Sequence, residues 1–262
     1  MERLGRDPLL YSSFLVNDED FSARELRDEI SQMIIQGKDD AAKDLLEKLK
    51  RCRHYKPSST KGGLNYQSVL EMELSLFTRE NSYEHPDVEK KIFQALKLTI
   101  PKFDIEKITR YLLAGSERSL IADLAAHYMQ AGNLKKAAVI YDALITYQTR
   151  QIVDEYEMAR TYAVTSFNYS TCLGRMGRRN KALDVIDEAL AFAMCKKRLT
   201  ATPSLIANKA YNLMMLEKKE ASLAYFAMAC FGFVMFPNSI NAKYLSNIQS
   251  VVQEKFSTEI FC

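Results

Sequence analysis

Apolar residues recur along most of this chain at positions i, i+3, i+4 and i+7, which is the spacing of one face of an α-helix. In the segment 119–128, Leu120, Ile121 and Leu124 share such a face, and a second set follows Gly132. A glycine between two periodic segments suits the left-handed position just past a helix end. No segment alternates as a strand does. The pattern predicts an all-α fold of about thirteen helices in antiparallel pairs.

One phrase occurs three times: a glycine, four mostly polar residues, an alanine, and an apolar residue four positions further on. The glycine is expected to end one helix. The alanine is expected where the next helix crosses the first most closely, because a larger side chain would push the two apart. This is the logic of the tetratricopeptide repeat. The three pairs are Gly37 with Ala42, Gly132 with Ala137, and Gly177 with Ala182.

The spacing of these glycines differs from the tetratricopeptide period of about 34 residues. Gly132 and Gly177 are 45 residues apart, and Gly37 and Gly132 are 95 residues apart. We therefore expect longer helices, and one repeat between residues 60 and 101 that lacks its glycine.

A last repeat also lacks the glycine but keeps a small and a bulky residue at Ala221 and Tyr225. We interpret residues 20–262 as about five helix pairs of the tetratricopeptide type, forming a right-handed superhelix with a concave inner face. Residues 1–19 are expected to be a linker or entry helix of the same single domain, 1–262. An unrelated helical bundle is the alternative.

The charge balance does not mark a nucleic-acid-binding chain. Thirty-six basic residues oppose 33 acidic ones, a net charge of +3, whereas such binding requires a strong basic excess on one face. One segment, 48–61, holds six cations and no acid. It contacts DNA phosphates or an acidic partner, or it is a solvated helix end, where cations suit the helix dipole. We favour the helix end.

The sequence also bears on location. The start, MERLGRDPLL, lacks the apolar stretch of a signal peptide. The five cysteines are odd in number and lack C-x-x-C spacing, which indicates reduced thiols. The apolar run from Ala221 to Phe236 is shorter than the roughly 20 residues of a membrane helix, so we expect it to be a buried helix. These features predict a cytoplasmic protein that has no membrane partner.

Patterns that carry catalysis or bind metal ions are missing from the sequence. It has no His-Glu-x-x-His, no Gly-x-Ser-x-Gly, no glycine-rich phosphate loop and no cysteine–histidine metal spacing. Its three histidines, His54, His85 and His127, are isolated. We therefore expect no enzymatic activity, no cofactor and no metal ion.

One position of the repeat carries an amide or an acid three times. Asn168 and Asn208 each lie two residues before a small residue, Ser170 or Ala210, and Asp123 has the same position one repeat earlier. Asparagine is mildly unfavourable inside a helix. Its amide both donates and accepts, as the backbone of an extended peptide requires. We therefore predict peptide-binding residues here. The alternative is that these groups satisfy neighbouring helix backbone or water.

Tyr211 lies close to Asn208 in the sequence and completes the predicted peptide site. A tyrosine ring offers apolar area and a polar tip to a ligand. The alternative for this ring is the core of the repeat.

The order of phrases along the chain resembles the C-terminal repeat domain of Gram-positive regulators in which tetratricopeptide-like repeats follow an Xre-type helix-turn-helix domain. These are the peptide-sensing regulators of the Rgg and PlcR kind. The matching phrases are LGRDPLLYSSFL (4–15), ELRDEISQMIIQGKDDAAKDLLEKL (25–49), ALKLTIPKFD (95–104), YLLAGSERSLIADLAAHYMQAGNLKKA (111–137), SFNYSTCLGRMGRRNKAL (166–183) and SLIANKAYNLMML (204–216).

The resemblance implies an effector-sensing and dimerising domain of a transcription regulator, which binds a short peptide or partner protein in its concave groove. No helix-turn-helix pattern precedes Leu4. We therefore expect the sensor part alone, a homodimer that reaches DNA only through a missing N-terminal domain. The alternative is a solitary protein-interaction scaffold with no link to DNA.

Overall fold

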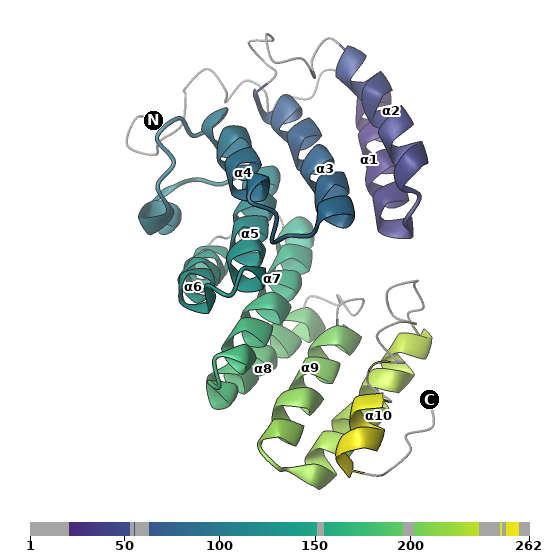
Figure 1. Ribbon diagram of the computed structural model, residues 1–262, viewed down its shortest axis with the longest axis vertical. Coiled ribbons are helices and arrows are strands. Elements are labelled where there is room, and N and C mark those ends of the chain that lie inside the picture. Colours follow the sequence, from purple (N-terminus) through teal and green to yellow (C-terminus); the bar gives the residue numbers. More distant parts are fainter. Residues whose placement is uncertain are drawn as a thin grey trace. The chain divides into compact units, whose positions relative to one another are not determined.

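The computed structural model describes residues 21–52, 55, 63–150, 155–195, 202–235, 247 and 250–256, and every regular element assigned in these ranges is a helix. Figure 1 shows coiled ribbons and no strand in these ranges. The predicted all-α fold is confirmed. The expected linker or entry helix, residues 1–19, lies outside the described residues.

The helices divide into two compact units, residues 1–133 and 134–262. That residues 1–262 form one repeat domain stays a prediction. The first unit contains α1 (Phe21–Gln36), α2 (Asp39–Arg51), α3 (Gly63–Asn81), α4 (Asp87–Lys97), the 3-10 helix η5 (Ile105–Arg110) and α5 (Gly115–Gln130). The second contains α6 (Leu134–Arg150), α7 (Glu155–Arg175), α8 (Arg179–Cys195), α9 (Thr202–Met215) and α10 (Lys219–Met235).

The glycines of the repeated phrase end their helices in the left-handed conformation. The φ angles of Gly37, Gly132 and Gly177 are +76°, +80° and +77°, a region that glycine enters without steric cost. After Gly37, the N–H of Lys38 donates to the carbonyl of Met33 at 2.9 Å, which is the Schellman closure of a helix end. The predicted helix–glycine–helix turn is confirmed.

Two helices without the glycine also end at a residue in the left-handed conformation. Ser82, after α3, has a φ of +70°, and Glu217, after α9, has a φ of +60°. The N–H of Lys218 donates to the carbonyl of Leu213 at 3.0 Å, so Glu217 closes α9 by the same Schellman arrangement. The left-handed conformation costs a residue with a Cβ about 1–2 kcal/mol. Five such turns in the described residues agree with the prediction of about five helix pairs.

The alanines of the phrase are buried. Ala42, Ala137 and Ala182 each have 0% of their surface exposed. The residues four positions later, Leu46 and Ile186 among them, are buried as well. A small residue followed by a bulky one therefore fills the interior at the start of α2, α6 and α8.

In the last repeat the prediction of Ala221 as the buried small residue is wrong. Ala221 is exposed, and Ser222 is fully buried. Ser222 stands five residues after Glu217, as each alanine stands five residues after its glycine, and its hydroxyl donates to the carbonyl of Ala210 at 2.9 Å. The bulky residue is Phe226, one position after the one expected. The left-handed residue determines which position of the next helix is buried. At Glu217 the residue type does not indicate that conformation.

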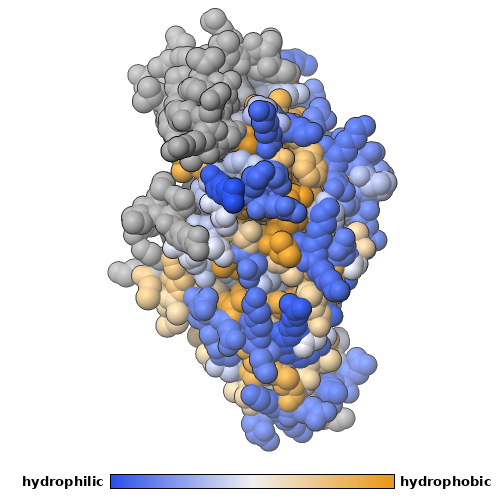
Figure 2. Space-filling model, turned by 90° about the vertical axis from the view of Figure 1, so that its left-hand side faces the viewer, coloured by the Kyte–Doolittle hydropathy of each residue, from blue (hydrophilic) through white to orange (hydrophobic). Residues whose placement is uncertain are grey.

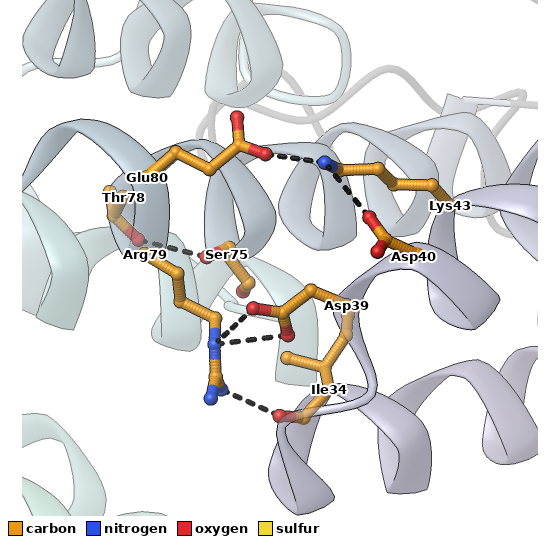
Figure 3. A network of polar contacts seen from close by, with 8 residues as sticks. All are labelled: Ile34, Asp39, Asp40, Lys43, Ser75, Thr78, Arg79 and Glu80. Carbon is orange, nitrogen blue, oxygen red and sulfur yellow. Dashed lines mark hydrogen bonds and ion pairs between the residues drawn. The ribbon is translucent and has the colours of Figure 1, made fainter.

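In the first unit, polar contacts fasten the turn between α1 and α2 to α3 (Figure 3). Arg79 of α3 donates to the carbonyl of Ile34 at 2.6 Å and from Nε to the carboxylate of Asp39 at 3.2 Å. Lys43 of α2 forms an ion pair with Glu80 of α3. The carbonyl of Ile34 also accepts from the N–H of Gly37 at 3.1 Å, so Arg79 adds a second hydrogen bond at this helix end.

In the second unit, each helix contacts the next one along the chain, and α7 also contacts α9. Figure 1 shows α9 and α10 side by side. One apolar cluster includes Ile186 and Leu205, and another includes Phe226 and Phe233. Consecutive helices therefore share buried apolar faces along the whole unit.

On the face drawn in Figure 2, hydrophilic residues predominate and hydrophobic residues lie between them. Within the described ranges, no helix has both the length and the hydropathy needed to cross a bilayer.

Cys52, Cys172 and Cys195 are free thiols, whereas Cys230 is disulfide-bonded. The prediction that all five cysteines are reduced is therefore wrong at Cys230.

Candidate functional site

Asn208 joins α9 to α7. Its side chain is 5% exposed. The amide nitrogen donates to the hydroxyl of Ser170 at 2.7 Å and to the hydroxyl of Thr171 at 3.1 Å, and lies 3.3 Å from the carbonyl of Phe167. All three acceptors belong to α7. These contacts agree with the alternative given for Asn208, in which its amide forms hydrogen bonds with a neighbouring helix and not with a peptide.

Asn212 lies one turn further along α9 and continues the polar contact between α9 and α7. It is 1% exposed, and its amide nitrogen donates to the carbonyl and to the side-chain oxygen of Asn208 at 2.9 and 3.0 Å. A Cβ added at Gly174 would lie 2.9 Å from the Asn212 oxygen. The absence of a side chain at Gly174 thus lets Asn212 pack directly on α7. Neither residue was predicted, although Asn208 and Asn212 at i and i+4 share a helix face.

Arg179, the first residue of α8, contacts this polar cluster at Asn212. Its Nη1 donates to the Asn212 side-chain oxygen at 3.3 Å, and its guanidinium carbon lies 6.0 Å from the centre of the Tyr211 ring. Tyr211 is 42% exposed, which makes it a surface ring and not a core residue. Arg179 is half-buried and has no acidic partner among the described residues.

Asn168 lies on α7, one turn before Thr171. It is half-buried, and its amide has no hydrogen-bonding partner within the described part of the chain. Val164, four residues earlier on the same face, is 47% exposed. We call Val164, Asn168 and Thr171 of α7, with Tyr211 and Met215 of α9, the α7/α9 surface.

Acidic residues are missing from most of α7 and from all of α9. In α7 they are limited to Glu155 and Glu157 at its start. Lys209 of α9 is paired with Asp187 of α8 at 2.5 Å. Among the described side chains near this surface, Arg175, Arg178 and Arg179 have no acidic partner. The α7/α9 surface therefore favours a ligand that brings negative charge.

Asp123 belongs to the first unit, so the predicted site residues do not form one described cluster. It is half-buried and accepts a hydrogen bond from the Tyr83 hydroxyl at 2.9 Å. Burial raises the pKa of the Asp123 carboxyl to about 6, although the hydrogen bond from Tyr83 opposes the rise. Burial and the Asp123 charge also raise the pKa of Tyr83. The second unit brings Asn168, Asn208 and Tyr211 onto two helices in contact.

The basic segment 48–61 is described only in part. Lys48, Lys50 and Arg51 stand in the last turn of α2, where cations suit the helix dipole. Lys50 pairs with Glu47 at 2.6 Å and also with Glu73. These residues have the helix-end arrangement. Across the described ranges, no three His, Cys, Asp or Glu residues lie close enough to hold a metal ion.

The fold places the chain among all-α proteins built from repeated helix pairs. No family model and no curated protein matches the sequence. The fold is similar to that in the crystal structure of Bacillus thuringiensis PlcR in complex with the peptide PapR7 and DNA. The TM-score is 0.67, and the likeness covers 91% of this chain and 78% of that one at 13% identity. At this identity the likeness is one of fold.

Proposed function

We propose that this chain is the effector-sensing and dimerising part of a cytoplasmic transcription regulator, and that it binds a short peptide in extended form on the α7/α9 surface. The fold supports the proposal, because the similar PlcR structure contains a peptide and DNA. DNA would be reached through a helix-turn-helix domain outside this chain.

The observation that carries the proposal is the amide of Asn168, which has no partner among the described residues and lies on a surface to which α7 and α9 contribute no acid after Glu157. An extended peptide must satisfy its backbone N–H and C=O groups when it leaves water, and one amide offers both a donor and an acceptor. Tyr211, on α9 of the same surface, offers an exposed ring to a ligand side chain.

Asn208 has a different role in this proposal. Its amide nitrogen is occupied by α7, so it fixes the spacing of the two helices and acts on the ligand through that spacing. Asp123, in the first unit, is proposed as a separate peptide contact through the carboxylate oxygen that Tyr83 does not use.

The proposal is tested by affinity selection from a synthetic library of random heptapeptides with the full 262-residue chain. We expect the chain to retain a subset, and Asn168→Ala to lose it by about 5- to 150-fold in affinity, as the loss of a hydrogen bond worth about 1–3 kcal/mol predicts. Asn180→Ala, an exposed asparagine on α8, is the matched control. Retention of no peptide, or equal retention by Asn168→Ala, would contradict the proposal.

The proposed dimerisation has a candidate surface of its own, which is the exposed face of α10. Met228, Phe231, Val234 and Met235 are 53–68% exposed, and α10 has no charged residue after Glu220. A charged partner would lose hydration here without a counter-charge. A second copy of this chain presents the same uncharged face, as a two-fold interface requires. We therefore propose that this face forms the homodimer.

A further inference from the structure

Arg179 is a cation with most of its hydrogen-bonding capacity unused. A guanidinium carries five N–H donors in a planar fork. The described residues accept one bond from it, at the Asn212 side-chain oxygen, 3.3 Å from Nη1. The Tyr211 ring lies against the guanidinium at 6.0 Å and accepts no hydrogen bond in its plane. The remaining donors are therefore available to a ligand.

The guanidinium is also held in one orientation. Asn212 cannot turn its oxygen away, because its nitrogen is bonded twice to Asn208 and its oxygen packs on Gly174. Arg179 Nη1 in turn lies 3.6 Å from the position of a Cβ at Gly174. An arginine fixed in this way loses little side-chain entropy when it binds a planar anion with two parallel hydrogen bonds.

The surroundings leave this position without a counter-charge. From Met158 to the end of α7, and throughout α9, no acidic residue occurs. Arg178 and Arg175, next to Arg179, are exposed cations without an acidic partner in the described ranges. A ligand that ends in a carboxylate would supply the missing negative charge.

We propose that Arg179, oriented by Asn212 and lying over the Tyr211 ring, binds a carboxylate of the peptide ligand, and that this is the carboxylate of the peptide's C-terminus. This inference rests on the proposed function, since it assigns one end of the same ligand. Asn168 and Gly174 are six residues apart on α7, which is about 9 Å of helix. An extended chain covers that length with about three residues. Asn168 therefore pairs with the peptide backbone about three residues before its C-terminus.

The test uses two synthetic heptapeptide libraries of the same composition, one with a free C-terminal carboxylate and one with a C-terminal amide. Both are built without Asp and Glu, and both are offered to the full chain. We expect the free-acid library to be retained about 10- to 100-fold more strongly, which is the range for hydrogen bonds to a charged group. Arg179→Gln should retain the two libraries equally, whereas Arg178→Gln should keep the preference of the unsubstituted chain.

Thermal melts of both variants establish that they are folded, and Arg179→Lys, which keeps the charge without the fork, should keep only part of the preference. Equal retention of acid and amide by the unsubstituted chain overturns the inference and leaves the proposed function standing if Asn168→Ala still reduces binding. Retention of neither library overturns both.

A third library with a C-terminal amide and internal Asp or Glu separates the two sources of carboxylate. We expect it to be retained no better than the neutral amide library. The contrary result is retention as strong as that of the free-acid library, with that retention abolished by Arg179→Gln. In that case Arg179 binds an acidic side chain, and the assignment to the C-terminus is wrong.

Discussion

The amide of Asn208 on α9 donates to the hydroxyl of Ser170 on α7 at 2.7 Å, and both side chains are buried. Sequence spacing predicted Asn208 and Asn168 as equivalent peptide contacts. The structure gives them different surroundings, since the amide nitrogen of Asn208 is occupied by α7 and the amide of Asn168 has no described partner. This difference determines which property each substitution should change.

Asn208→Ala should lower the free energy of unfolding by about 1–3 kcal/mol, because it leaves buried polar groups of α7 and Asn212 without their partner. Asn168→Ala should leave the free energy of unfolding within about 0.5 kcal/mol of the unsubstituted chain, as for an ordinary surface change. Urea denaturation followed by circular dichroism measures both. Equal losses from the two substitutions would mean that Asn168 also has a structural role.

Gly174→Ala should destabilise the second unit and weaken binding of free-acid peptides together. The new Cβ would lie 2.9 Å from the Asn212 oxygen, a contact that forces Asn212 and then Arg179 to move. Overpacking of this kind costs about 1–3 kcal/mol. Denaturation and the acid-to-amide retention ratio are measured on the same sample. An unchanged ratio would show that Arg179 does not depend on Asn212 for its orientation.

The left-handed turns predict opposite effects for two substitutions. Glu217→Gly should raise the free energy of unfolding by up to about 1 kcal/mol, because it removes about 1–2 kcal/mol of backbone strain and adds about 0.5–1 kcal/mol of entropy cost. Gly177→Ala should lower it by up to about 1 kcal/mol, because the added backbone strain exceeds the entropy cost of glycine that the substitution removes; its Cβ would meet no atom within 4 Å. Thermal melts check both signs, and a destabilising Glu217→Gly would show that the glutamate side chain contributes more than its strain costs.

Stability should depend on pH through Asp123. Its pKa in the folded chain, about 6, is above the ordinary value of 3.8. The folded state therefore binds this proton more tightly, and ionisation of Asp123 reduces stability as the pH rises through about 4 to 6. Asp123→Asn should be more stable than the unsubstituted chain at pH 7, by up to about 3 kcal/mol. The difference should disappear near pH 4. Urea titrations across pH 4–8 test this, and a difference that does not vary with pH would contradict the buried carboxylate.

The homodimer predicts that Phe231→Asp converts the chain to a monomer, because it places a charge in an uncharged interface. Val139→Asp, on an equally exposed position of α6 at 62%, is the matched control and should leave the dimer intact. Sedimentation equilibrium measures the mass of each. A monomeric unsubstituted chain would exclude this interface.

The sequence predicted the glycine turns because only glycine enters the left-handed region at no cost, so Gly37, Gly132 and Gly177 could be recognised from their spacing alone. Ser82 and Glu217 adopt that conformation with a Cβ, and nothing in their identity reveals it. The shift from Ala221 to Ser222 followed from this, since the register counts from Glu217.

The candidate site was predictable only in part. The helical period identified the repeat position shared by Asn168 and Asn208, because a polar residue is unusual on an apolar helix. The partner of each amide depends on the rotation and offset between α7 and α9, which one helix does not encode. Gly174 and Asn212 were missed for the same reason, since their roles arise from a close approach between two helices.

Because each helix of the second unit contacts mainly its neighbours in the chain, its folding is that of a one-dimensional array whose cooperativity resides in the junctions between repeats. The buried Asn208–Ser170 contact is part of one such junction. If that junction loosens, α9 and α10 would open as a block while α7 and α8 stay closed. Backbone amides on the two sides would then exchange with deuterium at separate rates.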